Sequence, residues 1–319
     1  MKKNSVLFTV LLFTFSTLYS KNGEGFTHYQ TEDDFIFAIS FTKKGEAIGI
    51  GDKESVKVFH TSSGEFIREF AGGHRNKILS IDISADSTLL VSGGRDSTIV
   101  LWDFTDGSVL KSLPHHRGIV TSVRISPCGK YILSGGTDNT VHLYDIERDN
   151  ITAVFSDHSD DITSVEFSYC GILFASAGGD RLINIYDLES LRPVDSLKGH
   201  RSWVRDISFS RDGKRLISCG DDSRIIVWNI EDTGNIREIS RKRSGFQWLL
   251  GVDFHEDSRT YVHGGISGNV EVNNPLDNYN VKIRTPLHRV IFRPGTGPVF
   301  MVAVATRGKG AKLIDFQRF

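Results

Sequence analysis

The sequence predicts an all-β protein: a seven-bladed β-propeller of four-stranded antiparallel blades, closed by an N-terminal strand that completes the last blade. Three observations support this fold. A set of four residue types recurs at an interval of 42 residues, short apolar segments alternate with tight turns, and weaker copies of the unit flank four clear ones. A register held through four copies indicates one supersecondary unit built repeatedly, because an insertion would shift all four positions.

The recurring set consists of a histidine, a serine, an aspartate and an aromatic residue. Its members are His74, Ser92, Asp96, Trp102, then His116, Ser134, Asp138, Tyr144, then His158, Ser176, Asp180, Tyr186, and finally His200, Ser218, Asp222, Trp228. Ser, His and Asp also form hydrolytic triads, but a single active site does not need four copies. The repetition therefore indicates architecture and not catalysis.

The unit that begins at His74 shows the strand pattern. Strands are predicted at 78–84, 89–93, 99–104 and 109–113, with turns at 85–87, 94–96 and 106–107. Four short antiparallel strands in each repeat are the pattern of a propeller blade. The third segment is apolar nearly throughout, which is typical of a strand that is buried on both faces between stacked blades.

Weaker units flank these four. The first is predicted at 36–41, 47–50, 56–60 and 65–70, with Phe59 at the tryptophan position. After Trp228, one unit is predicted at 249–254, 260–263, 269–272 and 281–284. The last unit supplies only three strands, at 290–292, 299–304 and 312–316, and the segment 26–30 is expected to provide the fourth. Seven blades follow, and the closure removes exposed sheet edges.

The run Ser92-Gly93-Gly94-Arg95-Asp96-Ser97-Thr98-Ile99-Val100-Leu101-Trp102-Asp103, with Gly199-His200 opening a later unit, resembles the WD-repeat family of β-propellers. The resemblance covers residues 74–229, although the Trp-Asp pair itself occurs only at Trp102-Asp103. It implies that each quartet is a buried hydrogen-bond chain from the indole N–H through serine and histidine to aspartate. Tyr144 and Tyr186 also carry a donor, but a phenol O–H and an indole N–H lie at different distances from the backbone. Whether those two units contain the complete hydrogen-bond chain is therefore left open.

Partner binding is expected where equivalent positions differ. The chain enters each first strand three residues after the histidine position, and the equivalent residues there are Phe35, Lys77, Ile119, Asp161, Trp203, Trp248 and Pro286. The resemblance implies that the loops leading into each first strand form the face that binds partners. Candidate partner-binding residues are Phe35, Arg201, Trp203, Arg241, Lys242, Arg243 and Trp248, because aromatic and arginine side chains are enriched in interface hot spots. Two alternatives stay open: the tryptophans cover the end of the core, or the basic run is a solvated loop.

Charge and motif content limit the function classes. The net charge of −1 argues against the basic surface of a sequence-independent nucleic-acid binder. From residue 237 onward, 13 Lys and Arg face 7 Asp and Glu, which gives +6 there and −7 elsewhere; this asymmetry is a candidate partner surface. We find no Gly-rich phosphate loop, metalloprotease helix or paired-cysteine spacing. We therefore expect no enzymatic activity, no cofactor and no metal, although His115-His116 is a weak metal candidate.

The first twenty residues differ from the rest of the chain. Lys2 and Lys3 precede an uncharged apolar stretch at 5–19, and Ser20 precedes polar residues. This pattern predicts a signal peptide over 1–20 and one propeller domain over 21–319. The stretch is shorter than the ~20 apolar residues that span a bilayer, so a secreted or periplasmic protein is favoured over one that is anchored by an uncleaved signal.

Three cysteines are too few for a disulfide framework. Cys128 and Cys170 are 42 residues apart and occupy the same turn of adjacent repeats, so a bridge is an open alternative if their Cα atoms lie within roughly 4.4 to 6.8 Å. Free thiols are favoured for both, and Cys219 is expected in the core.

These patterns together predict an exported, monomeric, non-enzymatic scaffold that presents one face to a protein or peptide partner. A hydrolase-like propeller with a site at the central channel is one alternative, but it needs a non-repeated set of acid, base or metal ligands. An intracellular nucleic-acid or RNA-processing scaffold is the other, and the near-zero net charge and the leader disfavour it.

Overall fold

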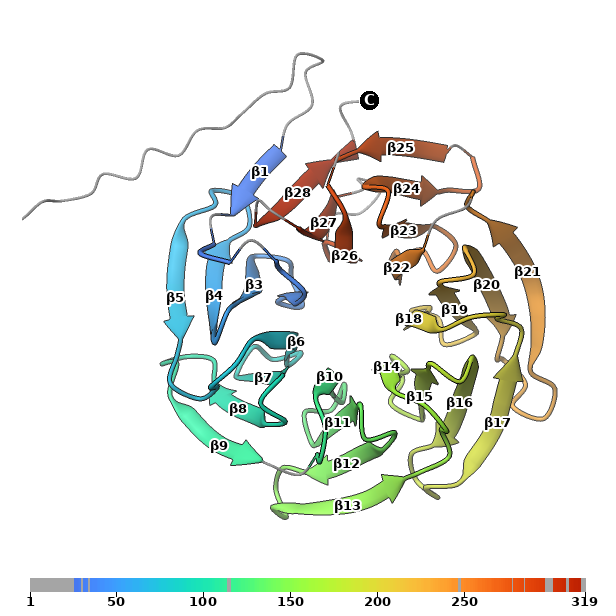
Figure 1. Ribbon diagram of the computed structural model, residues 1–319, viewed down its shortest axis with the longest axis horizontal. Helices are drawn as coiled ribbons and strands as arrows, with labels where there is room; N and C mark the ends of the chain where they lie inside the picture. Colours follow the sequence, from blue (N-terminus) through green and yellow to red (C-terminus); the bar gives the residue numbers. More distant parts are fainter. Residues whose placement is uncertain are drawn as a thin grey trace, which may run out of the picture.

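The computed structural model describes residues 26–316 except 30, 34, 114–115, 246–247, 277, 284, 296–300 and 308–309. The described residues form seven four-stranded antiparallel sheets arranged as blades around a central channel (Figure 1). This arrangement confirms the predicted fold class. The described part of the chain has no helix of the length and apolarity needed to cross a bilayer. The predicted signal peptide lies outside the described residues.

Three blades precede the middle of the chain. Blade 1 consists of β2 (Ile39–Phe41), β3 (Ala47–Asp52), β4 (Ser55–His60) and β5 (Phe66–Phe70). Blade 2 consists of β6 (Ile78–Ile83), β7 (Leu89–Gly94), β8 (Ile99–Asp103) and β9 (Val109–Leu113). Blade 3 consists of β10 (Val120–Ile125), β11 (Tyr131–Gly136), β12 (Val141–Asp145) and β13 (Asn150–Phe155).

Four more blades complete the ring. Blade 4 consists of β14 (Ile162–Phe167), β15 (Leu173–Gly178), β16 (Leu182–Asp187) and β17 (Pro193–Lys198). Blade 5 consists of β18 (Val204–Phe209), β19 (Arg215–Gly220), β20 (Arg224–Asn229) and β21 (Arg237–Arg243). Blade 6 consists of β22 (Leu249–Phe254), β23 (Tyr261–Gly265), β24 (Asn269–Asn273) and β25 (Asn278–Lys282). Blade 7 consists of β26 (Leu287–Phe292), β27 (Met301–Thr306), β28 (Ala311–Asp315) and the N-terminal strand β1 (Phe26–Tyr29).

Each blade places its first strand at the channel and its last strand on the outer circumference (Figure 1). The core lies between neighbouring blades: Val58 and Phe70 of blade 1 pack in one apolar cluster with Val100 and Trp102 of blade 2. Second and third strands are therefore covered on both faces, which explains why their sequences are apolar nearly throughout.

Six of the first strands carry a β-bulge after their first residue. The residues left out of the pairing register are Leu79, Thr121, Thr163, Arg205, Leu250 and His288. A bulge re-aims the side chain of the extra residue. All six side chains line a cavity at one end of the channel, so the same backbone irregularity builds a ring of variable residues there.

The ring closes through the N-terminal strand, as predicted. β1 pairs antiparallel with β28, with Phe26 opposite Ile314 and Tyr29 opposite Ala311. The Tyr29 hydroxyl donates to Thr61 O at 3.0 Å, which links blade 7 to blade 1. This closure gives β28 a partner on its outer side, so blade 7 has four strands like the other blades.

Three strand predictions were wrong by three residues at their start: those of β2, β25 and β26, the last of which begins at Leu287 and not at residue 290. β2 begins at Ile39 and not at residue 36, because the Ile36 N–H donates to Thr306 O of blade 7 at 3.2 Å. The fourth strand of blade 6 spans Asn278–Lys282 and not 281–284, because pairing ends where the Ile283 N–H turns to Gly268 O at 2.7 Å. Arg284, the last residue of that prediction, lies outside the described residues.

The three cysteines are free thiols. Cys128 and Cys170 are exposed in equivalent turns, where each Sγ lies 3.4 Å from the hydroxyl oxygen of a serine, Ser126 and Ser168 respectively. Cys219 is buried in the core, and burial raises its pKa.

Candidate functional site

The quartets of blades 2 and 5 are continuous hydrogen-bond chains. In blade 2 the Trp102 indole N–H donates to Ser92 Oγ at 2.8 Å, and Ser92 Oγ lies 2.7 Å from His74 Nε2. His74 Nδ1 lies 3.0 Å from Asp96 Oδ2. A carboxylate only accepts, so His74 donates from Nδ1 and accepts from serine at Nε2. Burial lowers the pKa of His74, which fits this neutral ring.

The same chain recurs in blade 5. Trp228 Nε1 donates to Ser218 Oγ at 3.1 Å, and His200 lies 2.9 Å from Ser218 Oγ and 3.0 Å from Asp222 Oδ1. Asp222 also accepts the Arg201 N–H at 2.7 Å. Each group in the chain is used by its neighbours, so the quartet ties the preceding loop to the second and third strands of its own blade.

Tyrosine changes the network in blades 3 and 4. His116 and His158 keep their bonds to Ser134 and Ser176, both at 2.9 Å. The hydroxyl of Tyr186 donates to Asp157 Oδ2 at 3.0 Å, and that of Tyr144 donates to Asp149. A phenol has one proton to donate, so neither tyrosine supplies the serine with the donor that tryptophan supplies in blades 2 and 5.

Blade 3 also brings two imidazoles together. The donor atoms of His116, Asp138 and His142 lie within 4.8 Å of one another, a grouping absent from the sequence prediction, which had considered His115-His116; His115 lies outside the described residues. The two imidazole rings are stacked, with centroids 4.1 Å apart and planes 16° from parallel. Nitrogen lone pairs lie in the ring plane, so nearly parallel rings do not direct them at one ion. The arrangement fits a packed extension of the quartet better than a metal centre.

Blade 6 has lost the quartet. A Cβ on Gly265 would meet the Trp248 carbonyl, just as a Cβ on Gly220 would meet the Trp203 carbonyl. The two glycines therefore occupy equivalent positions, and blade 6 is offset from blade 5 by 45 residues. At the quartet positions blade 6 therefore has Gly245, His263, Ser267 and Asn273. A cavity of about 280 Å³ lies there, lined by Gly245, His263, Ser267 and Glu271 among others. His263 Nε2 lies 3.3 Å from Glu271 Oε2, so a different polar contact occupies this blade.

One face of the propeller, which we call the mouth face, collects the variable positions. It is formed by the residues that precede the first strands, Phe35, Lys77, Ile119, Asp161, Trp203, Trp248 and Pro286, and by the turns between second and third strands. In six blades a turn N–H donates to the carbonyl of such a residue: Arg95 to Lys77, Thr137 to Ile119, Gly179 to Asp161, Asp221 to Trp203, Ile266 to Trp248 and Arg307 to Pro286. These turn residues also differ from blade to blade and form a second ring on the mouth face. The sequence prediction missed this ring, although comparing equivalent positions of the repeats would have found it.

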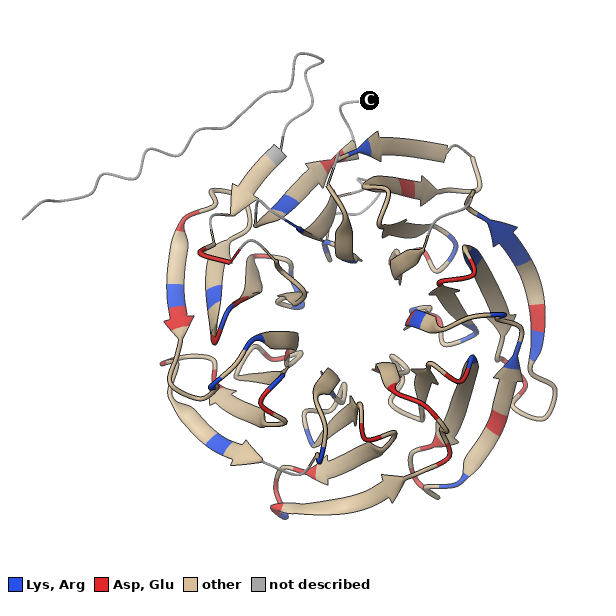
Figure 2. Ribbon diagram, in the orientation of Figure 1, with Lys and Arg blue, Asp and Glu red and all other residues tan. Residues whose placement is uncertain are grey.

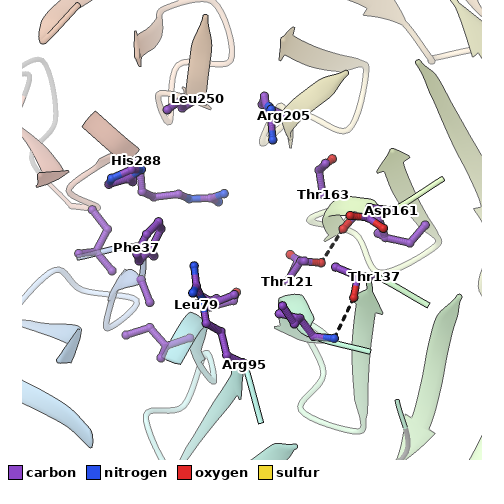
Figure 3. Close-up of a pocket in the computed structure, with 18 of the residues that line it drawn as sticks. Phe37, Leu79, Arg95, Thr121, Thr137, Asp161, Thr163, Arg205, Leu250 and His288 are labelled. Carbon is purple, nitrogen blue, oxygen red and sulfur yellow. Dashed lines mark hydrogen bonds between the residues drawn. The ribbon is translucent and has the colours of Figure 1, made fainter. Parts of the chain in front are cut away.

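The channel opens on the mouth face in a cavity of about 340 Å³. Phe37 and His288 lie on one side of it, opposite Thr121, Thr163 and Asp161 on the other (Figure 3). The rings of Phe37 and His288 contact each other at a tilt of 35°, with centroids 4.3 Å apart. Burial, together with the charges of Arg307 and Lys77, lowers the pKa of His288 to about 4. The mouth therefore has an aromatic, cationic side and a hydroxyl-rich, acidic side.

Deeper in the channel, charged side chains bond one blade to another. The Arg289 guanidinium of blade 7 donates to Asp206 Oδ1 of blade 5 at 2.6 Å, and Ser164 Oγ of blade 4 donates to the same carboxylate at 3.0 Å. Arg124 Nε donates to Glu166 Oε2 at 2.8 Å between blades 3 and 4. Burial outweighs Arg124 and raises the pKa of Glu166 to about 7. These groups hold the inner ring together.

The predicted aromatic residues differ in their surroundings. Trp248 is 52% exposed, and its backbone bonds to Ile266, which is 40% exposed. Trp203 is half-buried, with the Arg205 guanidinium 4.7 Å from its ring centroid. Phe35 is half-buried between Lys77 and Arg307, both within cation–π distance, and blade 7 separates it from Trp248. Trp203 and Trp248 thus lie on neighbouring blades of one face, while Phe35 is part of the closure.

The expectation that the basic run forms a loop was wrong. Arg241, Lys242 and Arg243 are the last residues of β21 and not a loop, because they continue the pairing with β20, where Arg224 faces Arg243 and Ile226 faces Arg241. Figure 2 shows this basic end on the outer circumference. Lys242 turns toward blade 6 and donates to Asn273 Oδ1 at 2.6 Å.

Comparisons with known proteins agree with this architecture. A family model described as the neurobeachin beta propeller domain matches residues 68–238, more than half of the 319-residue chain. The small ribosomal subunit protein RACK1y of Oryza sativa subsp. japonica is 37% identical over 59 residues, 18% of this chain and 17% of that protein. RACK1 of Drosophila melanogaster is 32% identical over 68 residues, 21% of each chain. Eukaryotic translation initiation factor 3 subunit I of Neurospora crassa is 30% identical over 84 residues, 26% of this chain and 21% of that protein. The chain therefore spans about a fifth of the length of the curated relatives it matches.

Proposed function

This chain belongs to the WD-repeat family of β-propellers, and we propose that it is a scaffold that docks a peptide segment of a partner protein on its mouth face. WD-repeat propellers are typically protein-interaction scaffolds and are generally non-catalytic. The fold supplies this general role, and the particular docking face is argued from the side chains below.

Exposed apolar residues at the mouth carry the proposal. Trp248 and Ile266 lie side by side and both keep a large part of their surface in solvent. The equivalent pair in blade 2 is Lys77 and Arg95, so the blade architecture does not require apolar residues at these positions. Contiguous exposed apolar side chains next to a cavity are typical of a binding surface. A peptide that covers Trp248 would remove this surface from water.

The channel offers less support for an enzyme. Catalysis needs an acid or base that is available to a substrate. Asp206 already accepts bonds from Arg289, Ser164 and Val252 N, the last at 3.1 Å, and Glu166 is bonded to Arg124. These contacts account for Asp206 and Glu166 as structural links between blades.

Export is a separate proposal that rests on the apolar segment at residues 5–19 alone. N-terminal sequencing of the native protein should find a mature chain that begins near Lys21. Recovery of Met1 in the native product would contradict it.

A double substitution tests the docking face. Trp248→Ala with Ile266→Ser should reduce the amount of cross-linked partner recovered from the producing cells by about tenfold or more, as expected for a hot spot worth more than about 1.4 kcal/mol. The matched control is Leu110→Ser, which changes a 50% exposed apolar residue on the outer strand β9. All variants should unfold within about 0.5 kcal/mol of the parent. If the double variant recovers as much partner as the parent, or if Leu110→Ser loses as much partner as the double variant, the partner docks elsewhere.

A further inference from the structure

Four arginines of blade 5 gather at the outer part of the mouth face. Arg201 lies in the loop before β18, Arg224 is the first residue of β20, and Arg241 and Arg243 lie at the end of β21. We call these four residues the arginine cluster. The positions equivalent to Arg224 in blades 2 to 4 are Thr98, Thr140 and Leu182, so blade construction does not require an arginine there.

Strand pairing puts three of these side chains on one side of the blade. Arg224 is directly opposite Arg243, and Ile226 is opposite Arg241. Opposite residues of an antiparallel pair, and residues two apart on one strand, project to the same face. Arg224, Arg241 and Arg243 therefore share a face, whereas Lys242 projects to the other. Like charges directly opposite each other are destabilising, so this pairing has a cost.

Contacts with one loop bring the guanidinium groups together. Arg224 Nη1 donates to Gly199 O at 3.0 Å. The Arg241 Nη2 atom lies 3.2 Å from the position that a Cβ on Gly199 would occupy, so a side chain there would crowd it. Arg201 follows two residues later in the same loop, and its N–H binds Asp222. The loop that contains Gly199 and Arg201 therefore packs against Arg224 and Arg241.

The carboxylates of Asp222 and Glu238, next to the arginine cluster, already accept several hydrogen bonds. Asp222 accepts from His200, from the Arg201 N–H and from the Arg224 N–H at 3.1 Å, and its Oδ2 lies 3.7 Å from Arg224 Nε. Arg241 donates from Nε and Nη2, along one edge of its guanidinium, to the two carboxylate oxygens of Glu238. Within the described residues, these are the two carboxylates that contact Arg201, Arg224 or Arg241. Burial, and repulsion from Arg201, Arg241 and Arg243, lower the pKa of Arg224, which indicates an excess of positive charge at this point.

We propose that the arginine cluster binds a phosphate group on a side chain of the peptide that docks on the mouth face. A phosphorylated side chain carries a charge of about −1.5 to −2 at pH 7 and three strong acceptor oxygens, and guanidinium groups bind such oxygens in bidentate geometry. One carboxylate would supply only a single charge. Blade 5 carries both the cluster and Trp203, so an apolar neighbour of the phosphorylated residue would contact Trp203 on the same face. This inference rests on the proposed docking function.

Fluorescent peptide pools of random sequence test the proposal when they differ only at a central phosphoserine, serine or glutamate. The phosphoserine pool should bind the full chain about tenfold or more tightly than the serine pool, with glutamate in between. Arg224→Gln and Arg201→Gln should each remove most of that preference. The control is Arg237→Gln, at the far end of β21, which should bind as the parent does.

Stability separates a binding role from a structural one. Arg201→Gln changes an exposed loop residue, and Arg224→Gln removes the bond to Gly199 O but relieves repulsion among the arginines, so neither should lower the melting temperature by more than a few degrees. A structural arginine would lower stability when it is removed.

Several outcomes would overturn the phosphopeptide assignment. Equal binding of the serine and phosphoserine pools would do so, as would an equal loss in Arg237→Gln, which would show a diffuse charge effect. Binding of phosphoinositide vesicles or of RNA that requires Arg201 and Arg224, without binding of the phosphoserine pool, would assign the cluster to a different ligand. If partner recovery depends on Trp248 and Ile266 but not on the arginines, docking stands and this inference fails.

Discussion

The tryptophan and tyrosine forms of the quartet should differ sharply in their contribution to stability. Trp102→Phe removes the donor to Ser92 Oγ, whose environment is fully buried, and leaves part of the indole volume empty next to Phe70 and His74. A buried acceptor without its donor costs about 1 to 3 kcal/mol, and the partial cavity adds about 1 to 2 kcal/mol. The free energy of unfolding should fall by about 2 to 5 kcal/mol.

Tyr144→Phe is the matched comparison in blade 3. Its hydroxyl donates to Asp149, whose side chain is 56% exposed, so water can replace the bond. The expected loss is about 0 to 1 kcal/mol. Equilibrium unfolding in urea, followed by circular dichroism so that loss of a tryptophan does not affect the signal, gives both values from the midpoint at constant slope. Equal losses for the two variants, or a larger loss for Tyr144→Phe, would refute the distinction between buried and solvent-facing networks.

Three further predictions concern the channel and the thiols. Because burial raises the pKa of Glu166 to about 7 and that of Asp253 to about 6, the folded state binds these protons more tightly than the unfolded state, and the free energy of unfolding should fall as the pH rises from about 5 to about 8. Urea titrations should show a flatter pH profile for Glu166→Gln and an unchanged one for the exposed control Glu189→Gln. Arg289→Gln leaves the fully buried Asp206 without its cation and should cost about 2 to 4 kcal/mol; a loss below about 0.5 kcal/mol in the same assay would be inconsistent with that ion pair. Reducing agent should not change the melting temperature, since Cys128 and Cys170 are free, and a clear decrease would indicate a disulfide.

The blades were predictable because their signal is repeated. The interval of 42 residues placed His74, Ser92, Asp96 and Trp102 in register with three later copies, and the strands between them are short and apolar. The closing strand β1 was also predicted, since a blade of three strands leaves an edge to be paired.

The site was less predictable because it depends on pairing register. The run Arg241-Lys242-Arg243 reads as one basic patch, but pairing with β20 sends Lys242 to blade 6 and leaves the two arginines with Arg224. Arg224 has no neighbour in sequence that marks it. The lost quartet of blade 6 was hidden by the change of offset to 45, which follows from a longer turn between β20 and β21.

The bulged residues show the same limit. Leu79, Thr121 and Arg205 look like ordinary members of apolar first strands. Only the register shift after the first residue of each strand turns them toward the channel, where they line the mouth. A sequence pattern of period two cannot show where such a shift occurs.

Docking on the mouth face is tested most directly by site-specific photo-cross-linking in the full chain. A benzophenone amino acid replaces Trp248 in one variant and Leu110 on the outer strand β9 in the other. Position 248 should form a covalent adduct with a defined peptide of the partner, and position 110 should not. An adduct at 110, or none at 248 while the partner still binds, would contradict docking on the mouth face.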